Sequence, residues 1–108
     1  MRRGDLVTIA LQGDYGKPRP ALVIQADLFN AARSRTMLPL TSAPQNAPLL
    51  RVRVEPTLEN GLRVPSWVMI DKPATVPADK IGAAFGHIDD ATMVTISRSL
   101  ALFLGLAE

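Results

Sequence analysis

Short apolar runs separated by proline- and glycine-containing segments are the feature that most constrains how this chain folds. Each run is four to six residues long and rich in β-branched side chains, which is typical of strands, and the segments between them favour turns. The sequence predicts strands at residues 6–11, 21–25, 36–40, 50–55 and 66–70, with a further short strand at 75–76. This spacing predicts a mainly β fold, in which a small antiparallel sheet or partial barrel is closed by one helix.

Two of these strands carry more specific expectations. Residues 50–55 alternate cleanly, which predicts a half-buried strand with an apolar and a charged face. Its apolar positions are Leu50, Val52 and Val54, and its charged positions are Arg51, Arg53 and Glu55. Because Pro39 cannot donate to a ladder, residues 36–40 should be irregular or lie at an edge of the sheet.

The last segment is predicted to be an amphipathic helix. Asp89 or Asp90 can cap its N-terminus and Gly105 can close its C-terminus. Apolar residues between them follow the spacing of one helical face, which predicts core packing. They are Met93, Ile96, Leu100, Phe103 and Leu104. One or two helical turns are also expected within residues 26–33.

Length and composition favour one small cytoplasmic domain without a metal or cofactor. The chain has 108 residues, enough for a single domain over residues 1–108. It has no cysteine and one histidine, which leaves no thiolate or His-cluster metal site. His87 is expected to be a structural or a surface histidine. No stretch approaches the ~20 apolar residues that span a bilayer, and nothing resembles a signal peptide.

Charge is distributed unevenly along the chain. Residues 1–53 carry eight Lys/Arg and three Asp/Glu, a net +5, whereas residues 54–108 carry four and seven, a net −3. These sum to the net charge of +2. A basic half suits an anionic partner such as nucleic acid, although a solvated surface is the commoner explanation of such an asymmetry.

A few polar residues stand where strands meet loops. Arg19 lies between two prolines, which would present its guanidinium from a stiffened backbone. Thr41 and Ser42 end a strand, where a hydroxyl either serves a site or satisfies a turn. Asp71 could cap a turn, pair with Lys72 or face a cleft. The pattern alone does not decide among these roles.

Read in order, four short motifs resemble the MazF/PemK family of type II toxins, the mRNA interferases. They are RRGDLVTIAL, then GDYGKPRPALVIQ, then LPLTS, then RVRVEPTLENGLRVPSWVMIDK, which together cover roughly residues 2–82. Each motif is weak alone, but four in order are specific. The resemblance implies a CcdB/MazF-like fold, an SH3-like partial barrel of five to seven strands with a C-terminal helix.

The resemblance also implies site residues. Arg19 matches the arginine that acts at the scissile phosphate in the family, Thr41 matches its usual catalytic partner, and Ser42 lies beside it. Asp71 matches an acidic position that some PemK-type members use as a base. Those members carry an arginine where this chain has Met69, which departs from their pattern.

Substrate contacts are expected around these residues. The loop at residues 12–18 is shorter than in many members, so Lys17 and Tyr15 would replace contacts made there. Ser42 and the charged strand face with Arg51 and Arg53 complete the expected RNA-binding set.

The chemistry of RNA cleavage suits these residue types. RNA carries its own nucleophile, the 2′-hydroxyl, so the protein must remove a proton and stabilise a phosphorane. An arginine fork and a hydroxyl can do the latter without a metal. The resemblance therefore implies a sequence-selective endoribonuclease that leaves 2′,3′-cyclic phosphate and 5′-hydroxyl ends.

The expected partners are single-stranded RNA, a second copy in a homodimer, and an antitoxin whose extended acidic tail occupies the RNA groove. Two alternatives stay open. A CcdB-like gyrase poison would need a Trp-Gly-Ile ending, whereas this chain ends FLGLAE. A non-catalytic nucleic-acid-binding barrel would bind RNA through Arg51 and Arg53 without cutting it.

Overall fold

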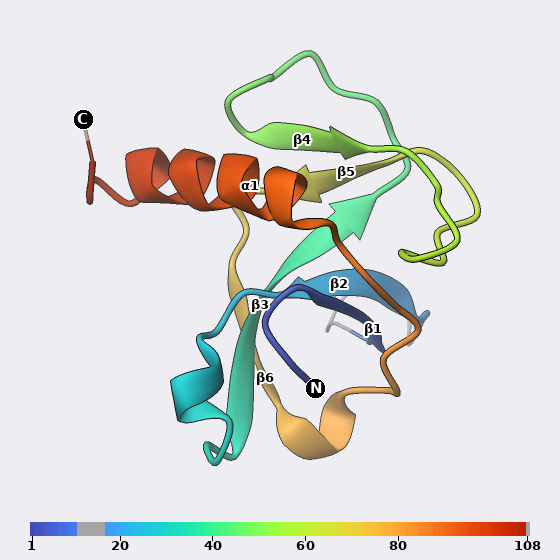
Figure 1. The fold of residues 1–108 in the computed structure, drawn as a ribbon, viewed down its shortest axis with the longest axis vertical. Coiled ribbons are helices and arrows are strands. Elements are labelled where there is room, and N and C mark those ends of the chain that lie inside the picture. Colours follow the sequence, from blue (N-terminus) through green and yellow to red (C-terminus); the bar gives the residue numbers. More distant parts are fainter. Residues whose placement is uncertain (11–16, 108) are drawn as a thin grey trace.

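The chain forms a curled antiparallel sheet with one long helix against it (Figure 1). The computed structural model describes residues 1–10 and 17–107. The strands are β1 (Asp5–Ile9), β2 (Arg19–Val23), β3 (Ser34–Thr41), β4 (Arg51–Val54), β5 (Ser66–Met69), β6 (Ala74–Pro77) and β7 (Gly86–His87). The helices are the 3₁₀ turns η1 (Asp27–Phe29) and η2 (Ala78–Lys80) and the α-helix α1 (Asp90–Phe103). The predicted mainly β half-barrel with a C-terminal helix is confirmed.

Strand β3 is the centre of the sheet, whose order is β4-β5-β3-β2-β1-β7 with β6 also paired to β3. One edge of β3 pairs with β2, and the other pairs with β6 at its start and with β5 at its end. Of the two alternatives predicted for residues 36–40, the edge position is therefore wrong and the irregularity at Pro39 is confirmed. Pro39 falls between the β6 and β5 registers, where β3 changes partner and a residue without an N–H is tolerated.

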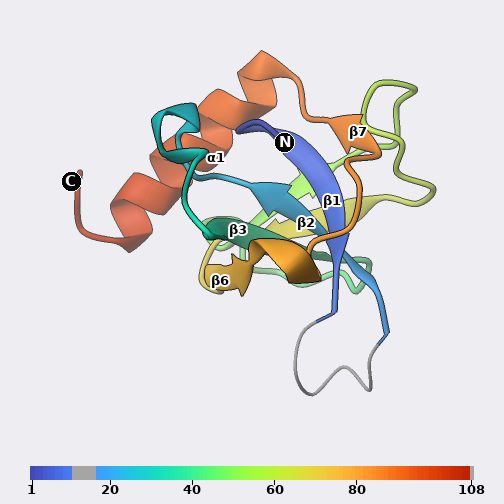
Figure 2. The same ribbon diagram turned by 90° about the horizontal axis from the view of Figure 1, so that it is seen from below.

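Helix α1 lies along one face of the sheet that β1, β2 and β3 form (Figure 2). Both faces of this sheet are buried, so its side chains divide between two cores. The larger core lies under α1 and contains Leu6, Leu22, Leu38, Leu40, Val54, Val68, Ile70, Ile88, Met93 and Ile96. The smaller core lies against β6 and contains Val7, Ile9, Ala21, Val23, Met37 and Val76. Burial on both faces explains why the runs at residues 6–11 and 21–25 do not alternate in polarity.

Helix α1 begins and ends as predicted. The Asp89 side chain accepts the Thr92 N–H at 3.0 Å, and Gly105 takes a positive φ of 73° just after the last turn. Met93 and Ile96 are buried.

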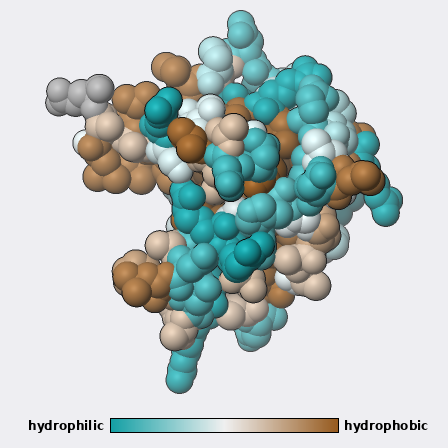
Figure 3. Space-filling view, in the orientation of Figure 1, coloured by the Kyte–Doolittle hydropathy of each residue, from teal (hydrophilic) through white to brown (hydrophobic). Residues whose placement is uncertain are grey.

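The C-terminal end of the helical stripe departs from the prediction of core packing. Phe103 and Leu104 are 45% and 51% exposed. Figure 3 shows hydrophobic surface at this end of the molecule. The last turn of α1 therefore presents an apolar surface instead of completing the core.

Strand β7 and η2 were not predicted, because two- and three-residue elements carry no periodic signal. β7 is attached to β1 by the side chain of His87, whose Nδ1 lies 2.8 Å from Asp5 Oδ1. Burial alone would raise the pKa of Asp5, but hydrogen bonds from His87 and the Arg2 backbone outweigh it and lower that pKa. The expected structural role of His87 agrees with this contact.

In the described part of the chain, α1 and the 3₁₀ turns are too short to cross a membrane.

Candidate functional site: a basic groove

A groove of about 690 Å³ opens where the start of β2 faces the loop between β4 and β5. We call it the basic groove. It is lined by Thr8, Lys17, Pro18, Arg19, Pro20, Leu40, Ser42, Gly61, Leu62, Arg63, Val64, Ser66 and Phe85. Segments distant in sequence therefore meet at one mouth of the half-barrel.

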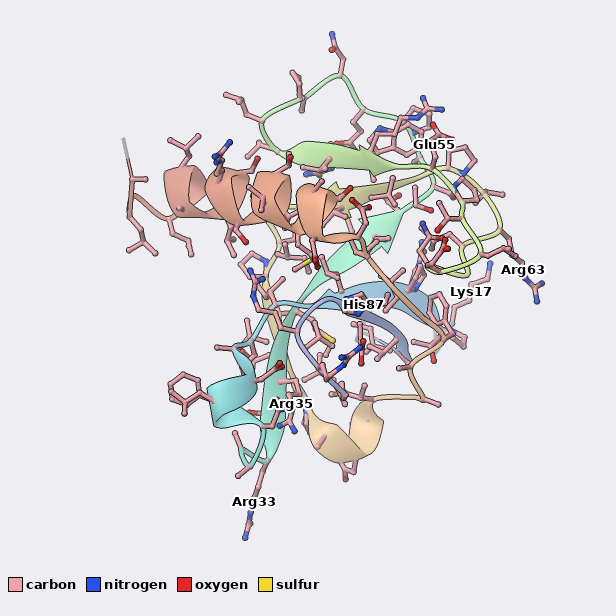
Figure 4. The ribbon with its side chains drawn as sticks, in the orientation of Figure 1. Lys17, Arg33, Arg35, Glu55, Arg63 and His87 are labelled. Carbon is pink, nitrogen blue, oxygen red and sulfur yellow. The ribbon has the colours of Figure 1, made fainter. Side chains whose placement is uncertain are left out.

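The lining carries positive charge from both walls. Lys17 and Arg19 come from one wall and Arg63 from the other, and all three are exposed. Figure 4 shows the side chains of Lys17 and Arg63 at the same edge of the molecule. Among the described lining residues there is no aspartate or glutamate. The described lining therefore offers a phosphate several cations.

Arg19 is held at the first position of β2. It pairs in register with Ile9 of β1, and the following Pro20 pairs with Thr8. The prolines on both sides of Arg19 restrict its backbone angles, and the pairing with β1 fixes the position of the strand start. The guanidinium is thus presented by a rigid strand end at the groove.

The end of β3 supplies the hydroxyl groups. Thr41 Oγ1 accepts the Ala43 N–H at 3.1 Å, so this hydroxyl supports the turn that follows β3. Its own O–H remains able to donate to a second acceptor. The next residue, Ser42, is exposed and lines the groove, and Leu40 lies on the same lining.

The facing loop is fixed by one buried asparagine. Asn60 is 4% exposed, and its side chain accepts the N–H groups of Thr57 and Leu62 and donates to the Glu55 carbonyl. Gly61 follows it with a φ of 67°, a backbone conformation that residues other than glycine rarely adopt. This network fixes the shape of the Asn60-Gly61 turn, which forms one wall of the groove.

Arg51 and Asp71 pair with each other outside the groove lining. Arg51, whose side chain is only 6% exposed, donates to Asp71 Oδ1 and, at 2.9 Å, to the Leu50 carbonyl. Although burial would raise the pKa of Asp71, the hydrogen bond and charge of Arg51 lower it overall. In the sheet register Arg51 of β4 lies opposite Met69 of β5. The arginine that pairs with Asp71 therefore comes from β4 and not from the strand that precedes Asp71.

Arg53 has its own partners on the outer face of β4. Its Nε donates to Glu55 at 2.5 Å, and its guanidinium lies 5.3 Å from the centre of the Trp67 ring. The charged face predicted for residues 50–55 is thus wrong at Arg51, which is buried, and correct at Arg53, which is exposed. Neither arginine lines the groove.

The structure therefore divides the residues that the sequence singled out. It brings Lys17, Arg19 and Ser42 to one groove, with Thr41 beside them, and places Arg51, Arg53 and Asp71 elsewhere. Tyr15 lies outside the described residues. Sequence reasoning missed Arg63 and Phe85, because nothing local indicated that their segments face Pro18–Pro20.

These features define a class of protein: a small β half-barrel backed by a C-terminal helix, with a basic groove at its mouth. In the described residues there is no cluster of three or more His, Cys, Asp or Glu side chains that could hold a metal ion.

Comparison with known proteins places the chain within this class. Residues 2–104 match the family of PemK-like, MazF-like toxins of type II toxin–antitoxin systems. A relative from Mycolicibacterium smegmatis, named a probable endoribonuclease MazF, is 48% identical over 108 residues, which is 99% of each chain.

Two solved structures share the fold. One is an endoribonuclease in complex with its cognate antitoxin from a mycobacterial species, with a TM-score of 0.84 at 24% identity, covering 100% of this chain and 98% of that one. The other is the Mycobacterium tuberculosis toxin MazF-mt6, with a TM-score of 0.82 at 21% identity, covering 96% and 99%.

The chain belongs to the PemK-like, MazF-like toxin family of type II toxin–antitoxin systems. The predictions of this family and of a MazF-like endoribonuclease toxin are confirmed. The gyrase-poisoning alternative is not favoured.

Proposed function

We propose that this toxin cleaves single-stranded RNA in the basic groove, without a metal ion, and leaves 2′,3′-cyclic phosphate and 5′-hydroxyl ends. The observation that carries the proposal is the meeting of Arg19, from a proline-flanked strand start, with the hydroxyl-bearing end of β3 at one cationic groove.

In this proposal Arg19 acts on the scissile phosphate. The 2′-hydroxyl loses its proton and attacks the phosphorus, negative charge grows on the nonbridging oxygens, and the bond to the 5′ oxygen breaks. The 5′ oxygen takes up a proton as it leaves, so the step releases no net proton. A guanidinium stays charged and donates two parallel hydrogen bonds, so it can stabilise that charge and orient the leaving oxygen.

Thr41 is proposed as the second catalytic residue, with Ser42 as a substrate contact. The Thr41 oxygen is held by the Ala43 N–H at 3.1 Å, which limits its rotation. Its O–H can then be directed at a nonbridging oxygen. Lys17 supplies a further cation for a flanking phosphate.

Asp71 is proposed to stabilise the fold through its ion pair with Arg51 instead of acting as the base. A carboxylate whose pKa is lowered by an arginine is a weak base near neutral pH. Its pairing with a buried guanidinium instead ties β4 to the end of β5. We therefore expect a change at Asp71 to affect stability more than chemistry.

The proposed partners follow from the same surfaces. The cations of the basic groove would also attract an extended acidic antitoxin tail, and the solved structures of this fold include an endoribonuclease in complex with its cognate antitoxin. The apolar residues exposed at the end of α1 and beside β4, Leu102, Phe103 and Leu49, favour a homodimer. Such a toxin would act in the cytoplasm.

Incubation of the pure protein with a long RNA in EDTA tests the proposal, with mapping of the new ends. We expect cleavage to persist and to give cyclic-phosphate and 5′-hydroxyl ends. Cleavage that requires added Mg²⁺ and gives 5′-phosphates would contradict the proposed mechanism. RNA binding without cleavage would support the non-catalytic alternative.

A further inference from the structure

We infer that Phe85 and the loop residues beside it form a nucleobase-binding subsite in the basic groove, and that this subsite helps to select the sequence that is cut. The inference rests on the proposed function in that it takes the strand in the groove to be RNA. It adds a residue and a ligand group that the catalytic arrangement does not use.

The subsite begins with apolar surface left open to water. Phe85 is 39% exposed and Val64 is 51% exposed, and both line the groove with the half-buried Leu62. Phe85 is the one aromatic residue in the described lining. A groove that binds only phosphates needs only cations. Exposed apolar surface among the cations therefore indicates a ligand that carries both negative charge and apolar surface.

A single nucleic-acid strand has that combination. Its phosphates suit Lys17 and Arg63, and its unstacked bases present flat apolar faces. An acidic peptide would also meet the cations, but the Asp and Glu side chains that carry its charge have no aromatic face to stack on a ring. The occupant that fits both features is a base attached to the strand whose phosphates meet these cations.

Phe85 is also held in place before any ligand arrives. Its N–H donates to the Leu6 carbonyl at 2.9 Å, which anchors it to β1. A Cβ at Gly61 would lie 2.8 Å from the Phe85 carbonyl oxygen and 3.2 Å from its ring, so the glycine allows the loop to pack directly on Phe85. At Gly86 a Cβ would overlap the Asn60 backbone. The ring therefore has a rigid support, which lowers the entropic cost of stacking a base.

The test compares two probes that cannot be cut. One is a short pyrimidine strand with 2′-fluoro sugars, which lacks the nucleophile. The other is the same strand with abasic positions, which keeps the phosphates and removes the bases. Stacking on an aromatic residue is worth about 1–3 kcal/mol per base, or roughly 5- to 150-fold in affinity. Wild-type protein should prefer the base-bearing strand by a factor in this range.

Phe85→Ala should lose most of that preference, while Phe85→Tyr should keep it. Phe29→Ala is the matched control, because Phe29 is 58% exposed on η1 and does not line the groove. Phe85→Leu retains apolar bulk and replaces the alanine variant if that variant melts early. Loss of preference in Phe85→Leu would still identify stacking as the cause.

Cleavage mapping separates this inference from the function on which it rests. For an active enzyme we expect Phe85→Ala to raise KM more than it lowers kcat and to broaden the set of cut sequences. Equal base preference and an unchanged cut pattern in Phe85→Ala would overturn the subsite. Base-dependent binding by a wild-type protein that cuts no RNA would support the subsite and refute the proposed nuclease.

Discussion

Two regions of this toxin carry arginines in different surroundings. At the basic groove, Arg19 and Arg63 face a lining that, over its described residues, has no carboxylate. At the β4–β5 ribbon, Arg51 is buried against Asp71, and Arg53 meets Glu55 and Trp67. The same residue type thus lines a groove in one place and forms ion pairs within the β4–β5 ribbon in the other. Position in the fold, more than charge, distinguishes the arginines proposed to bind a substrate.

The largest effect is expected from Arg19→Ala, which should slow RNA cleavage about a hundred- to thousandfold. Losing one preorganised donor to a developing oxyanion costs roughly 2.7–4 kcal/mol in a well-studied protease. The fold should persist, because Arg19 is an exposed strand-end residue. Cleavage of a defined RNA, growth arrest on induction and a melting curve check this. Near wild-type cleavage by a well-folded variant would remove Arg19 from the site.

Thr41→Ala tests the second residue proposed to act on the scissile phosphate. It should also reduce cleavage strongly, and the double variant should lose less than the product of the single effects, since both residues act on one phosphate. A fully multiplicative double variant would indicate that the two residues serve separate steps.

The sequence could predict many of the site residues and the ends of the helix, because short local patterns indicate them. Prolines flanking Arg19 and the strand end at Thr41 marked the site, and the Asp89 cap and Gly105 marked the helix. Arg63 could not be assigned, because its place opposite Lys17 depends on how β3 bends between two partners. Arg51 could not be told from Arg53 by alternation, since its burial depends on Asp71, twenty residues away.

Asp71→Asn tests the ribbon half of the comparison and should lower the free energy of unfolding by about 1–3 kcal/mol at neutral pH. It weakens the partner of the buried Arg51 guanidinium, and an unsatisfied buried donor costs about that much. Cleavage should change far less than in Arg19→Ala.

The effect of Asp71→Asn should also depend on pH. Because the pKa of Asp71 is lower in the folded chain than in the unfolded one, its stabilisation is present above the unfolded value of about 3.9. It is lost as pH falls through the folded value. The melting difference between wild type and variant should therefore shrink below about pH 4. A constant difference from pH 7 to pH 3 would contradict this role of the ion pair.

A smaller effect is expected on the salt dependence of RNA binding. Arg63→Ala should reduce the slope of log affinity against log salt by about 0.7, the value for one phosphate contact on a single strand. Arg33→Ala is the control, since Arg33 is exposed and points away from Lys17 and Arg63 (Figure 4). Equal slopes in both variants would show that the groove charge does not meet phosphates.

The smallest effect should follow Arg53→Ala. Its ion pair with Glu55 is exposed on both sides, at 57% and 61%, and exposed pairs contribute about 0–1 kcal/mol. Melting should hardly move and cleavage should be unchanged. A large loss of cleavage with normal melting would restore Arg53 to the substrate-binding set.

The most direct test of the account is to titrate the labelled protein with a non-cleavable 2′-fluoro RNA strand and follow backbone amide shifts by NMR. We expect the largest shifts at the groove, at Arg19, Ser42, residues 61–64 and Phe85, and little change at residues 51–55. Large shifts along residues 51–55 with an unperturbed groove would contradict the division between the two regions and move the RNA site to the ribbon.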